Sequence, residues 1–163
     1  MTPDELESIL QGQEETPRIE FKRPIPWDAD WLAKDILSMS NVQDGGYIII
    51  GVDDPFSRIG VTREIIDTYK IDEMKDQMTK YADPHVEFSI TIQKDTAGKD
   101  YLIIRVRQFE EIPVICRKNS RDTKAGTIYY RNKNRRIESA SVSNSYDMRT
   151  IIAVLLVLGS GCD

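Results

Sequence analysis

Four acidic residues in the first third of the chain have the type and spacing of a metal-binding or catalytic set. Glu15 and Glu20 lie five residues apart around one expected strand, and Asp53 and Asp54 follow a second. Strand ends in sheets flanked by helices are where functional side chains gather. Oxygen-rich sets of this kind select Mg²⁺ or Mn²⁺, which activates water and stabilises a phosphoryl transition state. The alternative is that these acids are solvated or paired with a nearby lysine or arginine.

A glycine turn precedes the second of these strands. Asp44-Gly45-Gly46 with Gly51 permits close backbone approach and could cradle a phosphate. No GK[ST] follows, so the turn is not a Walker A loop. The alternative is a tight connection from a helix to a strand.

A basic segment at residues 117–136 is the third feature. It holds eight basic residues against Asp122 alone, a net charge of +7, which leaves −12 on the rest of a chain that carries −5 overall. Tyr129 and Tyr130 lie within it. Cationic patches with interleaved aromatic side chains suit a nucleic-acid backbone and unstacked bases. The alternative is a solvated loop that balances acidic neighbours.

The elements that must position these residues follow from capping and periodicity. Thr2 and Glu5 form a capping box, and the alternation around Ile19 and Phe21 predicts a strand. The expected order is helix 2–12, strand 18–22, helix 29–41, strand 47–52, a helical stretch 62–82 broken near Tyr69, strands 86–93, 101–108, 113–117 and 127–131, and a C-terminal apolar segment. This order predicts a single α+β domain with a mixed β-sheet flanked by helices.

Length and composition limit the function classes. The 163 residues fit one domain at 1–145, with a segment at 146–163 expected to pack on that domain or on a partner subunit. The longest apolar run, 151–158, is too short to span a bilayer, so no membrane partner is expected. One histidine and two cysteines outside any CxxC pair argue against a His/Cys zinc site. So few cysteines fit a reducing cytosol, so a cytoplasmic location is expected.

Read together, these motifs resemble the Schlafen AlbA_2 domain. The resemblance rests on ExxxxEFK at 15–22, GGxxxxGVDD at 45–54, Ile59-Gly60, and Gly126-Thr-Ile-Tyr-Tyr-Arg131, and it spans roughly 15–140. It implies a nucleic-acid-binding domain. In Schlafen-type ribonucleases two glutamates five apart and a later aspartate form a metal-dependent site that cuts tRNA. Carried over, that site is Glu15, Glu20 and Asp54, with Asp53 as the alternative, around Mg²⁺ or Mn²⁺.

The expected nucleic-acid contacts combine this resemblance with the basic segment. They are Lys22, Arg117, Lys118, Tyr130, Arg131, Lys133, Arg135 and Arg136. One short domain lacks the second lobe with which larger Schlafens clamp tRNA, so homo-oligomerisation is expected to complete a comparable cleft. Two alternatives stay open: a non-catalytic DNA- or RNA-binding module of a regulatory or defence system, and a nucleotide (ATP)-binding or structural oligomer.

Overall fold

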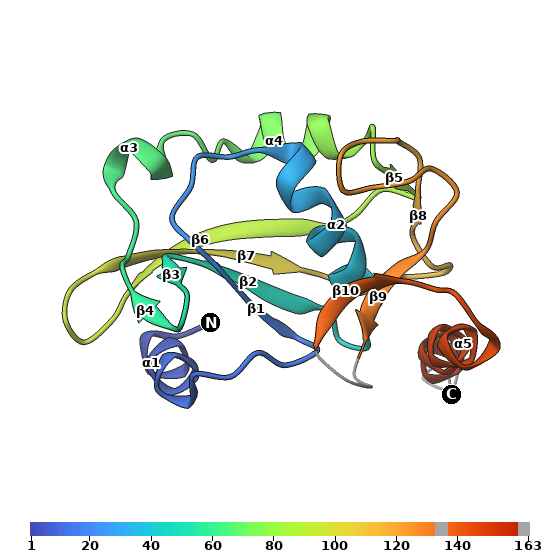
Figure 1. The fold of residues 1–163 in the computed structure, drawn as a ribbon, viewed down its shortest axis with the longest axis horizontal. Coiled ribbons are helices and arrows are strands. Elements are labelled where there is room, and N and C mark those ends of the chain that lie inside the picture. The colour runs from blue at the N-terminus through green and yellow to red at the C-terminus, as the bar shows by residue number, and fades with distance from the viewer. Residues whose placement is uncertain (133–136, 160–163) are drawn as a thin grey trace.

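The protein, a computed structural model that describes residues 1–132 and 137–159, is built on a mixed four-stranded sheet in the order β1-β2-β7-β6 (Figure 1). The strands are β1 (Ile19–Lys22), β2 (Gly46–Ile50), β6 (Phe88–Lys94) and β7 (Asp100–Val106). β1 and β2 are parallel, whereas β7 is antiparallel to both β2 and β6. The predicted α+β class with a mixed sheet is therefore confirmed.

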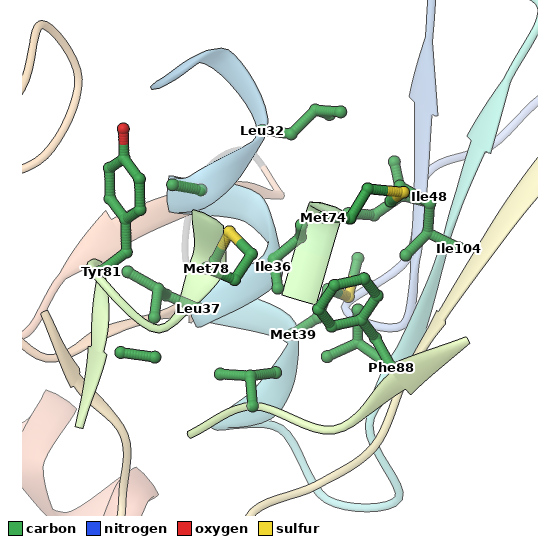
Figure 2. Packing of buried hydrophobic residues seen from close by; sticks show 14 of the residues in the cluster. Leu32, Ile36, Leu37, Met39, Ile48, Met74, Met78, Tyr81, Phe88 and Ile104 are labelled. Atoms are coloured by element: carbon green, nitrogen blue, oxygen red, sulfur yellow. The ribbon is translucent and has the colours of Figure 1, made fainter. Parts of the chain in front are cut away.

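Helices cover both faces of this sheet. α2 (Ala29–Ser40) and α4 (Ile71–Met78) bury one face, on which Ile48 lies. α1 (Pro3–Gly12) packs on the other face, against Ile49. Successive strand residues point to opposite faces, and the uninterrupted isoleucines of β2 therefore supply both cores. Figure 2 shows the larger core, where two methionines of α4 meet α2 and the sheet.

Capping residues set where the first two helices begin. The hydroxyl of Thr2 accepts a hydrogen bond from the amide of Glu5, whose carboxylate accepts one from the amide of Thr2. Asp28 caps α2 by accepting from the amide of Trp31. Each cap satisfies amides that the helix leaves unpaired, and these elements therefore begin where the sequence predicts.

Three two-stranded ribbons complete the fold. They are β3 (Val52–Asp53) with β4 (Ser57–Arg58), β5 (Ala82–Asp83) with β8 (Ile115–Cys116), and β9 (Tyr129–Asn132) with β10 (Glu138–Ser141). The sequence analysis expected no strand at β10. Its residues, Glu-Ser-Ala-Ser, carry no β-branched or aromatic side chain, so only pairing with β9 reveals it. The β9/β10 ribbon packs beside α2.

The remaining helices are short or peripheral. α3 (Arg63–Ile66) and α4 are separate, as the expected break near Tyr69 requires. α5 (Ser145–Gly159) lies beyond the β9/β10 ribbon in Figure 1, and its Val154 joins the larger core. Within 1–132 and 137–159, no helix combines the length and the apolar character needed to cross a membrane.

Candidate functional site

A cleft of about 670 Å³ opens where β1 ends beside α2, the β3/β4 ribbon and the β9/β10 ribbon. All four acids singled out in the sequence line it: Glu15, Glu20, Asp53 and Asp54. The other described residues of its wall are Phe21, Lys22, Arg23, Trp31, Lys34, Asp35, Val52, Phe56, Asp122, Ile137, Glu138 and Ser139. The fold thus brings the glutamates around β1 and the aspartates after β2 into one cleft.

Glu20 is buried at the floor of this cleft between two cations. Its Oε1 lies 2.6 Å from Lys22 Nζ, and its Oε2 lies 2.6 Å from Arg131 Nη1. Glu20 and Lys22 are two residues apart on β1, so they share one face of the strand. The Arg131 side chain reaches them from β9 and is fully buried. Both oxygens of Glu20 are therefore engaged by the protein itself.

Asp35 extends this ion pair into a network of four elements. Its Oδ2 lies 2.9 Å from Lys22 Nζ, and its Oδ1 accepts a 2.6 Å hydrogen bond from Ser139 Oγ. Burial opposes the charge on Lys22, but the Asp35 and Glu20 carboxylates outweigh it and raise the pKa of Lys22. Arg131 Nη1 also donates to Ser139 Oγ at 3.3 Å. The network thereby ties β1 and α2 to the β9/β10 ribbon.

Asp35 and Ser139 are site residues that the sequence analysis missed. The sequence pattern around Asp35 could have identified it as a site residue. It lies four residues after Trp31 and four before Met39, at the edge of the apolar face of α2, where a helix seldom places an unpaired acid. Ser139 carried no such signal, since it lies on the strand that the sequence did not reveal.

Glu15 places a carboxylate in the same cleft, where burial disfavours its negative charge. Its carboxylate accepts a 3.2 Å hydrogen bond from the amide of Phe21. Burial and the neighbouring Glu20 carboxylate nevertheless raise the pKa of Glu15 above its ordinary value. The folded protein therefore holds this carboxylate in its charged form at a cost, which is a common property of functional sites.

Glu15→Gln is expected to stabilise the fold near neutral pH. The folded state raises the pKa of Glu15, so ionised Glu15 favours unfolding once the pH exceeds that raised pKa. Glutamine keeps an oxygen for the Phe21 amide and removes the charge. The gain should vanish as the pH falls below 4.5, the ordinary value, where both states are protonated. Urea unfolding at several pH values measures it, with the exposed neighbour Glu14→Gln as control; equal shifts in both variants would contradict this origin.

The structure separates the residues expected to contact nucleic acid. Arg117 is exposed, whereas Lys118 lies against Tyr81 and 3.2 Å from Asp30, at the rim of a second cleft. Lys22 is mostly buried between carboxylates. Lys133, Arg135 and Arg136 lie outside the described residues.

Arg131 and Tyr130 require a correction. Both were expected on a nucleic-acid-binding surface, but both are buried on β9. The Arg131 guanidinium points into the protein because it pairs there with the buried Glu20 carboxylate. The Tyr130 hydroxyl oxygen is itself buried, and this burial together with the adjacent Asp147 carboxylate raises its pKa.

The glycine turn at 44–46 packs closely against its neighbours. Gly45 adopts φ +65°, and a Cβ there would lie 2.2 Å from the Val106 carbonyl oxygen. A Cβ on Gly46 would lie 2.2 Å from Met39 Sδ. Both glycines are buried and neither lines either of the two clefts, so the turn is a tight connection from α2 to β2.

The acids do not fit a preformed metal site. Within the described parts of the chain, no three His, Cys, Asp or Glu side chains are grouped closely enough to hold an ion. Glu20 would have to leave Lys22 and Arg131 to bind one. Asp53 and Asp54 are exposed at the end of β3, in the β3/β4 ribbon. The Asp53 carboxylate accepts a hydrogen bond from the Asp54 amide.

Comparisons with known proteins agree with the resemblance seen in the sequence. The model of a family described as "Schlafen, AlbA_2" matches residues 15–140. These limits contain the whole of β1 to β9 and reach into β10, so the cleft lies within the matched region. No curated protein matches the chain.

One similar solved structure is the DIP2311 protein from Corynebacterium diphtheriae. It superimposes with a TM-score of 0.56 at 19% sequence identity, over 90% of this chain. The chain spans only 27% of that protein's length. At this identity the similarity concerns the fold alone.

Proposed function

The chain belongs to the Schlafen AlbA_2 family, and on that premise we propose that it is a nucleic-acid-binding domain whose strand-end cleft receives RNA. One observation carries the proposal: the basic segment borders the cleft. Asp122 of that segment lines it, and so does Ile137, the residue that follows the segment. Arg121 and Lys124 are exposed beside Asp122. Arg121, which pairs with Asp122 at 3.0 Å, and Lys124 therefore lie next to a wall residue of the cleft and are available to a phosphate backbone that approaches it.

Two further cations belong to the wall itself. Arg23 is exposed at the end of β1, and Lys34 is half-buried on α2. Because they come from different elements of the same wall, they suit contacts with two phosphates of one bound strand. They act as backbone contacts, which position a nucleic acid without reading its sequence.

Reversing these two charges is expected to weaken RNA binding at least tenfold. Each lost phosphate contact should lower the slope of log affinity against log salt by about 1, so Arg23→Glu/Lys34→Glu should lower it by about 2. Fluorescence anisotropy with a single-stranded 12-mer and with tRNA, over a salt series, measures both. Lys75→Glu/Lys94→Glu is the matched control, with the same change of charge on α4 and on β6, the strand at the other edge of the sheet from β1. Equal losses in the two double variants, or salt-independent binding, would remove the proposal.

A second candidate is a metal-dependent endoribonuclease acting on tRNA or structured RNA. It is favoured by the gathering of Glu15, Glu20, Asp53 and Asp54 in one cleft. The ion pairs of Glu20 with Lys22 and Arg131 stand against it, because Glu20 would have to leave both cations to bind Mg²⁺ or Mn²⁺. Among the residues that the structure describes, the acids also form no group of three that could hold such an ion. RNA binding is therefore the function that this geometry supports first.

The binding experiment also separates these two functions. Bound RNA is recovered after incubation with Mn²⁺ and run on a denaturing gel. Full-length RNA is expected from the wild-type chain. Cleavage that Glu15→Gln and Asp54→Asn each abolish would establish the nuclease instead.

A further inference from the structure

We propose that the cleft takes an unpaired base of a single-stranded nucleic acid, and that the indole of Trp31 is the surface on which this base stacks. The proposal rests on the nucleic-acid-binding function and adds the class of ligand and the mode of contact. Its basis is the wall of the cleft, which combines aromatic rings with carboxylates inside and cations at the opening.

Three aromatic side chains line the cleft, and each is half-buried. They are Phe21, Trp31 and Phe56. Phe21 and Phe56 pack edge-to-face, with ring centroids 5.7 Å apart and planes at 88°. Within the described residues Trp31 stacks on no other ring; its indole instead carries Lys22 Nζ 5.4 Å from the ring centroid. Trp31 is therefore the largest ring in the wall, and no other described aromatic ring packs against it.

The position of Trp31 is fixed before any ligand binds. It lies in the first turn of α2, where its amide donates to the capping carboxylate of Asp28. One turn further along the same helix, Asp35 anchors Lys22, which holds the cation against the indole. A preorganised ring loses little conformational freedom when a base stacks on it.

The charge of the wall selects a base over a phosphate. Of the described residues that line the cleft, seven are acidic and three are basic. Glu20 and Asp35 are neutralised by their ion pairs, but Asp53, Asp54 and Glu138 are exposed. A phosphate inside would meet these carboxylates, whereas the amino group of cytosine, adenine or guanine would donate hydrogen bonds to them. The backbone then stays outside, near Arg23 and Lys34.

The size of the cleft points to a single strand. A volume of about 670 Å³ is that of a small-molecule site and matches one or two nucleotides. The bases of a duplex are stacked inside the helix and cannot reach Trp31 without being extruded, which costs unpairing and unstacking energy. Single strands present their bases at no such cost, and stacking on an aromatic side chain is the usual way in which they are held.

The chain offers a direct optical test, because its two tryptophans lie in different clefts. Trp31 lines the cleft described above, and Trp27 lines the second one, where its Nε1 donates to Gln77. Trp27→Phe leaves Trp31 as the single reporter, and Trp31→Phe leaves Trp27. Single-stranded oligocytidylate, 12 nucleotides long, is the probe. We expect it to quench the fluorescence of the Trp27→Phe protein and to leave that of the Trp31→Phe protein unchanged.

Affinity supplies the second readout. Trp31→Ala is expected to weaken oligocytidylate binding about tenfold, within the range of about 5- to 150-fold that loss of one stacked base produces. Oligouridylate has a carbonyl in place of the amino group at ring position 4 and an N–H in place of the bare nitrogen at position 3. Because the carboxylates lose the donor at position 4, it should bind several-fold more weakly than oligocytidylate. Asp54→Asn/Glu138→Gln should reduce that difference, and circular dichroism confirms that each variant is folded.

The outcomes separate this inference from the function on which it rests. Binding with no Trp31 quenching and with full affinity in Trp31→Ala overturns the inference and leaves the proposed function intact. Equal affinity for the two oligonucleotides overturns the role of the carboxylates. No binding of oligonucleotides or tRNA by the wild-type chain overturns the proposed function and the inference together.

Discussion

Arg131→Met is expected to lower the free energy of unfolding by about 3–5 kcal/mol, the range for removing one partner of a buried ion pair. The arginine is fully buried, and its Nη1 lies 2.6 Å from Glu20 Oε2. Its Nη2 also donates to the carbonyl oxygens of Thr16 and Ile19, both at 3.4 Å. Methionine fills much of the volume but leaves the Glu20 carboxylate with one cation in place of two. The free energy of unfolding of a small domain is about 5–15 kcal/mol, so this loss should appear as a large fall in the urea concentration at the unfolding midpoint.

Two companion variants identify the cause of that loss. Arg121→Met removes an exposed arginine and should change stability by less than about 0.5 kcal/mol. Glu20→Gln/Arg131→Met removes the stranded charge together with its partner, so it should be less destabilised than the sum of the two single variants. Additive losses in the double variant would show that the two side chains are not coupled. Arg131→Lys retains the charge and gives a folded comparison if the methionine variant does not fold.

Gly45→Ala is expected to destabilise the protein by about 3 kcal/mol or more. The left-handed backbone conformation at φ +65° costs a residue with a Cβ about 1–2 kcal/mol, and overlap in a packed region adds about 1–3 kcal/mol. The atoms in the way are the Val106 carbonyl oxygen at 2.2 Å and the Gln108 amide nitrogen at 2.9 Å. Both belong to the backbone, so no side-chain rotation relieves the contact. Thermal and urea unfolding measure the effect.

Gly98→Ala is the matched control for this prediction. Gly98 also has a positive φ, +81°, but a Cβ there would meet nothing within 4 Å. Its substitution should cost only the conformational part, about 1–2 kcal/mol. The difference between the two variants therefore measures the close approach of the turn to β7. Equal losses in the two variants would contradict the close packing of the turn against β7.

Much of the fold was predictable from short-range patterns. The capping box at Thr2 and the cap at Asp28 set the starts of α1 and α2, and both depend on residues three apart. The alternation in β1 and the apolar run in β2 identified strands, because side chains alternate between the two faces. Such signals need no knowledge of the tertiary structure. β10 lacked them, since its four residues are stabilised as a strand only by β9.

The residues of the candidate site were also only partly predictable from the sequence. Glu15, Glu20, Asp53 and Asp54 were recognised from the sequence by their residue type and by their position around expected strands, and the structure places all four in one cleft. The sequence alone also located the basic segment that borders it. What it could not show was how each charge is neutralised, because that depends on side chains far apart along the chain.

Only the tertiary structure decided the roles of Arg131, Asp35 and Ser139. Arg131 and Glu20 are separated by 111 positions, and Asp35 and Ser139 by 104. A buried carboxylate must have a cation or a hydrogen-bond donor, and the fold, not the local sequence, determines which one is within reach. For this reason Arg131, which was expected to contact nucleic acid, instead pairs with Glu20 at the floor of the cleft.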